Sequence, residues 1–273
     1  MFLICLSRFM KRIIIFIILL SITSCSRQDG PLLVEEGRII VLMYHRIVKG
    51  EATNTYERSV ADFEADLKFL KENNIKVVSF SDIDKVVRSG KMPKVNSAVI
   101  SFDDGDHSWY TLVRPLLLEY KIKATFFLWT YMIGHDSFLS WYEVEQMSYY
   151  TLSGGVRPFT FGSHTYSHQY LYGQKSHFEN MNEYNLFLDY ELSKSKTLIE
   201  AHTPEDVTML ALPFGDGAGD PDIISAAERN GYKFIRTSIL GTIDNPDVNL
   251  FEIPILPMLI DTESDLIGYY LNL

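Results

Sequence analysis

The sequence predicts an α/β fold in which seven or eight parallel strands close into a barrel. Apolar, β-branched runs alternate along the chain with segments of helical period, and this alternation is typical of parallel α/β proteins. The runs are nearly continuous in apolar residues, so both faces of each strand are expected to be buried. Their number favours a closed barrel over an open sheet.

The predicted elements follow one another without a recognisable linker, repeat or low-complexity stretch. The expected strands are the runs 38–43, 76–80, 97–102, 123–129, 159–162, 208–212, 233–237 and 251–258. Apolar side chains recur at helical spacing in three segments between them, which predicts helices over 60–74, 185–201 and 221–230. Gly231 follows the third segment, and glycine is common just beyond the end of a helix. Residues 38–273 are therefore expected to form a single domain.

The composition is that of a globular protein and argues against a nucleic-acid partner. Apolar residues make up 47% of the 273 residues and charged residues 22%. The formal net charge is −10, and it becomes −13 if residues 1–24, which hold three basic and no acidic residues, are removed. An acidic surface repels the phosphate backbone of nucleic acids.

The first 25 residues have the pattern of an export signal that ends at a lipidation site. Met10-Lys11-Arg12 precedes an apolar run over 13–20, which is shorter than the roughly 20 residues that a membrane span needs. The small residues before Cys25 resemble the lipobox of bacterial lipoproteins. This resemblance implies a signal peptide over 1–24, a lipidated Cys25 that begins a tether over 25–37, and a membrane-anchored protein of the cell envelope. The alternative is a generic signal peptide with a chance cysteine.

Reactive side chains come directly after four of the predicted strands. They are His45, the pair Asp103-Asp104, the pair His164 and His168, and the segment Pro213-Phe214-Gly215. The carboxyl ends of the strands carry the active site in (β/α) barrels. We therefore expect these side chains to converge at one end of the barrel.

The two histidines and one of the two aspartates predict a metal site. Residues four positions apart lie on one face of a helical turn, so His164 and His168 could present two imidazoles together. With a carboxylate, for which Asp104 is the best candidate, they make a three-ligand site with positions open for water and substrate. Alone, the histidine pair could be surface residues and Asp103-Asp104-Gly105 a plain turn. This ligand set suits Zn²⁺, with Co²⁺, Ni²⁺ or Fe²⁺ as alternatives.

Two of these motifs resemble the polysaccharide deacetylases, which are carbohydrate esterase family four. They are Ser101-Phe102-Asp103-Asp104-Gly105 and His164-Thr165-Tyr166-Ser167-His168, supported by the segments 123–128 and 211–215. The resemblance covers most of residues 38–258. It implies a distorted (β/α) barrel of about seven strands and a metal-dependent hydrolase. Such an enzyme would remove N-acetyl groups from a chitin-like glycan, poly-N-acetylglucosamine or peptidoglycan, releasing acetate.

The resemblance also implies a role for each matched residue. Asp103 would be the general base, and one divalent metal ion would bind to Asp104, His164 and His168. The backbone N–H of Phe214, which follows Pro213, would stabilise the oxyanion.

Two positions depart from the pattern of the family. Its usual acid, a histidine near the C-terminus, is absent, because no histidine follows His202. Some members carry the acid in an N-terminal Tyr-His instead, and Tyr44-His45 looks like that arrangement, so His45 is the predicted acid. A packed histidine that fixes its strand by hydrogen bonds is the alternative. The family's arginine two residues before the proline is Ala211 here, and Arg236 is the candidate substitute for orienting Asp103.

Two other functions are compatible with the sequence. One is a metal-dependent hydrolase of another small amide or an O-acetyl ester, because a fold does not determine its substrate. The other is a catalytically inactive glycan-binding lipoprotein, which would not need a base, an acid and metal ligands together. The remaining histidines are expected in loops or on the surface, and Trp129 is expected to pack in the core.

Overall fold

The computed structural model describes residues 36–273. The predicted signal peptide, Cys25 and almost all of the predicted tether lie outside the described residues. The main sheet contains β1 (Ile39–Tyr44), β4 (Lys76–Val77), β5 (Ser97–Asp104), β6 (Ala124–Leu128), β7 (Phe159–Ser163), β8 (Met209–Ala211), β9 (Phe234–Leu240) and β10 (Ile253–Pro257). Each of the eight predicted runs contributes one of these strands.

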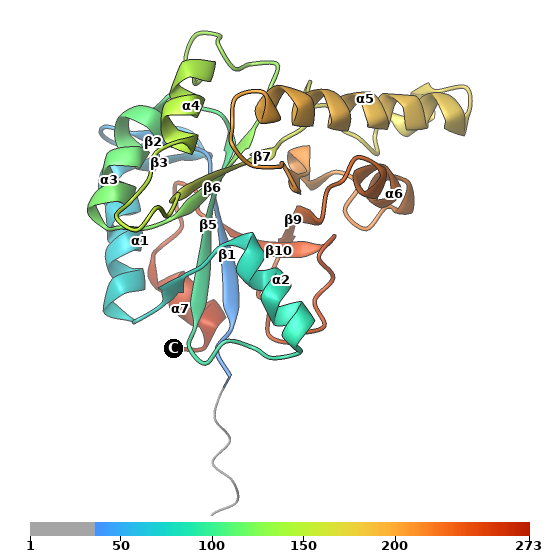
Figure 1. Cartoon of the computed structure of the whole chain (residues 1–273). Coiled ribbons are helices and arrows are strands. Elements are labelled where there is room, and N and C mark those ends of the chain that lie inside the picture. The colour runs from blue at the N-terminus through green and yellow to red at the C-terminus, as the bar shows by residue number, and fades with distance from the viewer. Residues whose placement is uncertain (1–35) are drawn as a thin grey trace, which may run out of the picture. The chain divides into compact units, whose positions relative to one another are not determined.

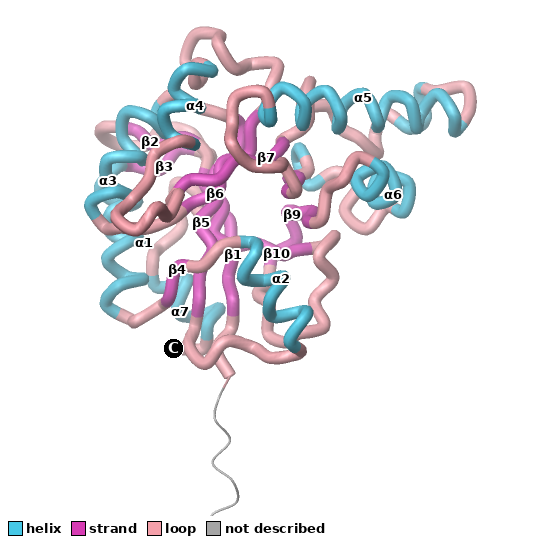
Figure 2. Tube along the Cα trace, in the orientation of Figure 1, coloured by secondary structure: helices cyan, strands magenta, loops and turns pink. Residues whose placement is uncertain are grey.

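The sheet closes because β1 pairs on both of its edges. One edge of β1 pairs with β5 along its whole length, with Tyr44 beside Phe102, and the other edge pairs with β10. Seven parallel strands therefore form the ring, and β4 borders only the start of β5. The ring is irregular, since β8 has three residues and the register between β9 and β10 shifts. This confirms the predicted distorted (β/α) barrel, whose strands surround a common axis in Figure 2.

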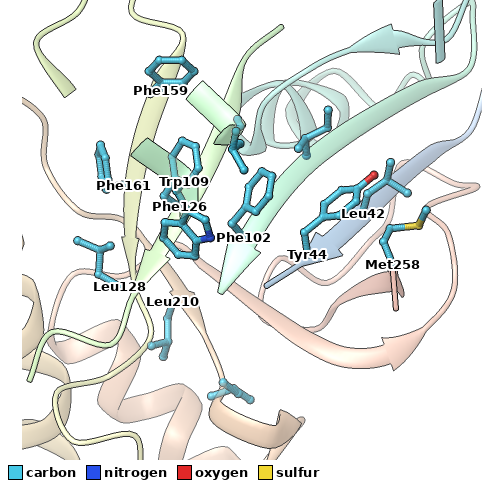
Figure 3. Close-up of a cluster of buried hydrophobic side chains, with 14 of the residues drawn as sticks. Leu42, Tyr44, Phe102, Trp109, Phe126, Leu128, Phe159, Phe161, Leu210 and Met258 are labelled. Carbon is cyan, nitrogen blue, oxygen red and sulfur yellow. The ribbon is translucent and has the colours of Figure 1, made fainter. Parts of the chain in front are cut away.

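Helices cover the outside of the barrel. They are α1 (Val60–Glu72), α3 (Arg114–Glu119), α4 (Trp141–Ser148), α5 (Met181–Glu200), α6 (Pro221–Arg229) and α7 (Asp265–Leu271), with a π-helical turn over Trp109–Val113. The apolar residues of these helices and the outward side chains of the strands form the larger core, part of which Figure 3 shows around Phe102, Trp109 and Phe126. The three predicted helices are confirmed. The middle one, α5, begins four residues early, where Asn180 accepts hydrogen bonds from the N–H groups of Asn182 and Glu183.

A second, smaller core fills the inside of the barrel. It contains the inward residues of the strands, such as Val41, Val99 and Phe127, and helix α2 (Phe80–Ser89) packs against it. The ring centroids of Phe80 and Phe127 are 5.7 Å apart. The sequence-based assignment of 76–80 as a strand is wrong at its end: β4 stops at Val77, because the Ser79–Asp82 capping box starts a helix there.

Between β1 and α1 in the sequence, the chain forms a small two-stranded sheet. It consists of β2 (Arg46–Val48) and β3 (Glu57–Ser59). Among the helices described between residues 36 and 273, none combines the length and the hydrophobicity that crossing a bilayer requires.

Candidate active site and metal centre

The alternation of side chains along the strands directs the predicted catalytic residues into the barrel. Val41 and Val99 belong to the inner core, and side chains two positions apart share one face of a strand. His45 and Asp103 stand four residues after these valines, so they extend the inner face at the carboxyl end. Arg236 likewise lies on the inner face, two residues after the inward-facing Phe234.

A cavity of 490 Å³ opens at this carboxyl end of the strands. Six residues from the predicted site line it, and they are His45, Asp103, Asp104, His164, His168 and Phe214. The convergence expected from the sequence is thus observed. Pro213 and Arg236 are buried, and neither lines the cavity.

Asp104, His164 and His168 bring three possible ligand atoms together. The Nε2 atoms of the two histidines are 3.1 Å apart. Oδ1 of Asp104 lies 3.5 Å from Nε2 of His164 and 3.4 Å from Nε2 of His168. Ligand atoms bound to one Zn²⁺ at about 2.0–2.1 Å in tetrahedral geometry stand about 3.3 Å apart. The three atoms therefore fit a single ion of this kind.

The tautomer of His164 also fits a ligand. Its Nδ1 lies 2.9 Å from the carbonyl oxygen of Ala211, and a neutral ring can donate there only through Nδ1–H, which leaves the lone pair of Nε2 toward Asp104. Burial lowers the pKa of His164 to about 4, so its ring is neutral at pH 7. Burial acts to raise the pKa of Asp104, but the hydrogen bond from His168 and the nearby imidazoles outweigh burial and lower that pKa well below its usual range.

The loop that carries the histidines is not helical, and the interpretation of the four-residue spacing as a helical turn is wrong. His164 follows β7 directly, and residues 164–170 contain no helix. Instead, Thr165 and His168 have φ values of 61° and 59°, in the left-handed region. These two reversals turn the loop back, so that the imidazoles meet with their ring centroids 4.7 Å apart.

The remaining site backbone is strained in the same way. Asp104 has a φ of 91° and Phe214 a φ of 58°. Non-glycine residues rarely adopt such values, which cost of order 1–3 kcal/mol each and concentrate at functional sites. Asp104 is the last residue of β5, and Phe214 lies in the turn over Pro213–Gly215 that follows β8.

Asp103 is a buried carboxylate with one oxygen bound and one free. Its Oδ2 accepts a hydrogen bond from Nη2 of Arg236, and both side chains are almost fully buried. Its Oδ1 is buried without a hydrogen-bond partner among the described residues. The structure thus places Arg236 against Asp103, the predicted base. Met43 Sδ and the carbonyl of Thr237 accept from Nη1 of Arg236 and fix its plane.

His45 lies in the cavity wall under the exposed ring of Tyr56. The two ring centroids are 4.8 Å apart, and Nδ1 of His45 is buried without a hydrogen-bond partner in the described chain. The carbonyl oxygen of His45 accepts a 2.7 Å hydrogen bond from Nε1 of Trp109. The backbone, not the imidazole, therefore fixes the end of β1.

Aromatic contacts to His168 are the part of the site that the sequence interpretation missed. The ring of Trp129 stacks on His168 at 4.7 Å, so Trp129 serves the site rather than the core as expected. The ring of His168 also meets that of Phe214 edge-on, with centroids 4.6 Å apart, and Phe214 stacks on Tyr170 at 4.1 Å. The only signal in the sequence was the position of Trp129 at the end of a strand.

The other histidines lie away from the three-ligand cluster. They are mostly exposed, and two of them pair with glutamates: His107 with Glu143 and His202 with Glu145. None of them lines the cavity, in agreement with the expectation that they are loop or surface residues.

Known proteins resemble this chain in both sequence and fold. The sequence model of the family described as polysaccharide deacetylase matches residues 90–235. That range includes Asp103, Asp104, His164 and His168 but neither His45 nor Arg236.

Curated relatives match over most of the chain. Poly-beta-1,6-N-acetyl-D-glucosamine N-deacetylase of Staphylococcus epidermidis is 29% identical over 248 residues, which cover 84% of this chain and 82% of that protein. Bacillus subtilis YxkH is 26% identical over 197 residues, which cover 72% of this chain but only 63% of YxkH. Among solved structures, Streptococcus pyogenes deacetylase PplD in complex with acetate has a TM-score of 0.73 at 18% identity, covering 86% of this chain and 99% of that one. This last likeness concerns the fold.

Proposed function

Because this chain belongs to the polysaccharide deacetylase family, we propose that it is a metal-dependent hydrolase that removes N-acetyl groups from an N-acetylated glycan. The family match extends over more than half of the chain, and it confirms the predicted family and class of enzyme. One observation carries the proposal: Asp104, His164 and His168, whose ligand atoms converge, line the same cavity as Asp103, whose Oδ1 has no hydrogen-bond partner among the described residues.

The residues of the cavity have complementary roles in the proposed reaction. A divalent ion held by Asp104, His164 and His168 would lower the pKa of water and polarise the acetamide carbonyl. Asp103 accepts a proton from the attacking water through its free Oδ1, while Arg236 fixes Oδ2. The backbone N–H of Phe214, at the turn after β8, is the proposed donor to the oxyanion.

The leaving nitrogen needs a proton, because an amine anion is a very poor leaving group. His45 is the proposed acid, since its ring lines the cavity and its Nδ1 has no partner in the described chain. Water adds its oxygen to the carbonyl carbon, the C–N bond breaks, and the nitrogen takes up the proton from His45. The products are acetate and a glycan unit with a free amine.

We propose poly-β-1,6-N-acetylglucosamine as the first substrate to test. The named relative from Staphylococcus epidermidis acts on this glycan, and it aligns with 84% of the chain. Half-exposed rings of Tyr56 and Phe214 line the cavity and offer flat apolar faces to pyranose rings.

Acetate release tests the proposal. The zinc-loaded protein should release acetate from β-1,6-linked N-acetylglucosamine oligomers faster than from acetylated chito-oligomers, a peptidoglycan fragment, an O-acetyl ester or small amides. Asp103→Asn should keep the metal and lose activity by at least a hundredfold, because general-base catalysis contributes about 10²–10⁴. A wild-type rate in Asp103→Asn would refute the assigned base, and the absence of acetate from every substrate would refute the function.

We also propose export to the cell envelope and a lipid anchor at Cys25. The support is the pattern of residues 10–25 alone. In detergent phase partitioning, the wild-type protein should enter the detergent phase and the Cys25→Ser variant should stay in the aqueous phase. Equal partitioning of the two proteins would contradict the anchor.

A further inference from the structure

A buried carboxylate on α5 contacts the loop that carries the two histidines. Glu191 is 2% exposed and lies in the middle of the helix. Its two oxygens accept hydrogen bonds from Ser167, from the backbone N–H at 2.8 Å and from Oγ at 2.6 Å. Ser167 stands directly before His168, and Glu191 has no part in the proposed chemistry.

The backbone of the same helix residue adds a third contact. The carbonyl oxygen of Glu191 accepts a 3.2 Å hydrogen bond from the N–H of Tyr166. Three of the loop's donors, from two successive residues, therefore end on one residue of α5. Hydrogen bonds to an ionised acceptor are roughly twice as strong as neutral ones.

The helix holds the start of the loop as well. Ser195 is one turn after Glu191 and so lies on the same face of α5. Its Oγ accepts a 2.7 Å hydrogen bond from Oγ of Ser163, and Oγ of Ser163 accepts from the N–H of Thr165 at 3.1 Å. Hydrogen bonds to α5 thus hold the loop at Ser163 and again at Tyr166 and Ser167, and α5 packs against β7 (Figure 1).

This segment needs such support because its conformation is strained. Thr165 and His168 both have positive φ, and such backbone persists only where surrounding contacts hold it. Within residues 163–168, the second reversal is supported by the hydrogen bond from the N–H of His168 to Oγ1 of Thr165. Burying the Glu191 carboxylate among neutral donors costs free energy of folding. Its hydrogen bonds are therefore expected to fix the conformation of the loop rather than to add to the net stability of the protein.

We propose that Glu191 is a positioning residue that holds His164 and His168 in the geometry required to bind a divalent cation. The inference rests on the proposed function, because it takes the histidines as metal ligands. Glu191 acts through Ser167 and touches neither the cation nor the substrate. Without it the loop relaxes, the separation of the two Nε2 atoms is no longer fixed, and affinity for the ion falls.

Zinc affinity of the full chain, measured by chelator competition, tests the proposal. Glu191→Ala should weaken Zn²⁺ binding by about 10–100-fold, the usual effect of losing a residue that orients metal ligands. Glu191→Gln keeps the shape and can still bond to Ser167, so it should restore most of the affinity. Leu188→Ala is the matched control: Leu188 is fully buried in the larger core on the same helix, and its apolar side chain has no hydrogen bond to offer the loop.

The outcomes separate positioning from folding. Leu188→Ala should lower the unfolding midpoint but bind Zn²⁺ as wild type does. Wild-type affinity in Glu191→Ala, or an equal loss in Leu188→Ala, would overturn the proposal. If Glu191→Ala does not fold, Ser167→Ala decides, with an expected loss of severalfold; unchanged affinity overturns the proposal. Failure of the deacetylase assignment would show separately, as no acetate release from a wild type that still binds Zn²⁺.

Discussion

At the scale of single residues, Arg236 can be tested as the residue that orients the proposed base. Arg236→Lys keeps the charge but loses the planar guanidinium, which also bonds Met43 and Thr237. We expect kcat to fall about 10–100-fold with KM within twofold, because a displaced base loses alignment without changing binding. Steady-state kinetics on the best oligomer checks this prediction, and an unchanged kcat would mean that Asp103 does not depend on this contact.

A paired carboxylate and a histidine pair that each follow a strand identify Asp103, Asp104, His164 and His168 in the sequence. The geometry in which the two histidines meet could not be predicted from the sequence, because it depends on positive φ at Thr165 and His168, which is uncommon for residues other than glycine. The contact of Trp129 with His168 likewise depends on how two loops pair.

Tyr56 should contribute to sugar binding rather than to chemistry. Its half-exposed ring covers His45 and lines the cavity. Loss of one aromatic contact of about 1 kcal/mol corresponds to a roughly fivefold rise in KM. Tyr56→Ala is therefore expected to raise KM for oligomers to that extent, and Tyr56→Phe to leave it unchanged.

The control for Tyr56 is Tyr269→Ala, which removes an exposed tyrosine from α7. A similar change in KM in this control would indicate a nonspecific effect. If Tyr56→Ala lowered kcat without changing KM, the role of Tyr56 would be to position His45 rather than to bind the sugar.

At the scale of elements, the eight strands were predictable because buried parallel strands are continuous apolar runs. Helix α2 was not, since Phe80 continues such a run and the signal that ends it is the capping box of Ser79 and Asp82. The strands β2 and β3 have three residues each and no apolar pattern. They pair in parallel, and the cross-strand neighbours Arg46 and Glu57 form a 3.2 Å ion pair.

Close approach between strands makes Gly162 of β7 a sensitive position. A Cβ at this position would lie 2.6 Å from the ring of Phe127 and 3.0 Å from the carbonyl oxygen of Met209. Gly162→Ala is expected to lower the free energy of unfolding by about 1–3 kcal/mol, the usual effect of overpacking. Urea denaturation measures it, with Gly50→Ala as control because nothing lies within 4 Å of a Cβ there. Equal stabilities would contradict the predicted clash.

At the scale of the whole molecule, closure of the barrel unites strands that are distant along the chain. The proposed acid His45 follows β1, the proposed base Asp103 lies one residue before the end of β5, and Arg236 lies on β9. Their convergence requires β1 to pair with both β5 and β10. The number of apolar runs in the sequence suggests a closed barrel, but it does not predict the register of these strand pairs. Global stability and ion binding should therefore be coupled.

Removal of the metal should destabilise the whole protein. An ion present at 100 times its Kd adds about 2.7 kcal/mol to the free energy of unfolding. For a domain of this size that corresponds to a fall of roughly 5–10 °C in Tm when a chelator is added. Differential scanning calorimetry measures the shift. His168→Ala is the control and should give the same Tm with and without chelator; an equal shift in that variant would indicate another binding site.

Buried tyrosines predict loss of stability at high pH. Burial raises the pKa of Tyr232, whose hydroxyl donates to the carbonyl of Leu192, and burial together with the charge of Asp66 raises the pKa of Tyr44. In the unfolded chain both ionise near pH 10. Their contribution is thus complete below about pH 10 and declines as the pH rises toward the folded pKa, by about 1.4 kcal/mol per pH unit for each tyrosine.

Urea midpoints measured from pH 8 to pH 11 check this dependence. Tyr232→Phe should flatten the decline above pH 10, whereas Tyr269→Phe, which changes an exposed ring, should not. A stability that stays constant to pH 11 in the wild type would contradict the raised pKa values.

The two ends of the described chain lie at the amino-terminal end of β1. Arg38, directly before β1, donates to the carbonyl oxygen of Tyr270, and Asn96, directly before β5, donates to that of Leu271. The cavity opens at the opposite, carboxyl end of the strands. An attachment through residues before 36 would therefore join the barrel on the side away from the catalytic opening and would not block polymer arriving from solution. Immobilisation through either terminus should leave turnover intact.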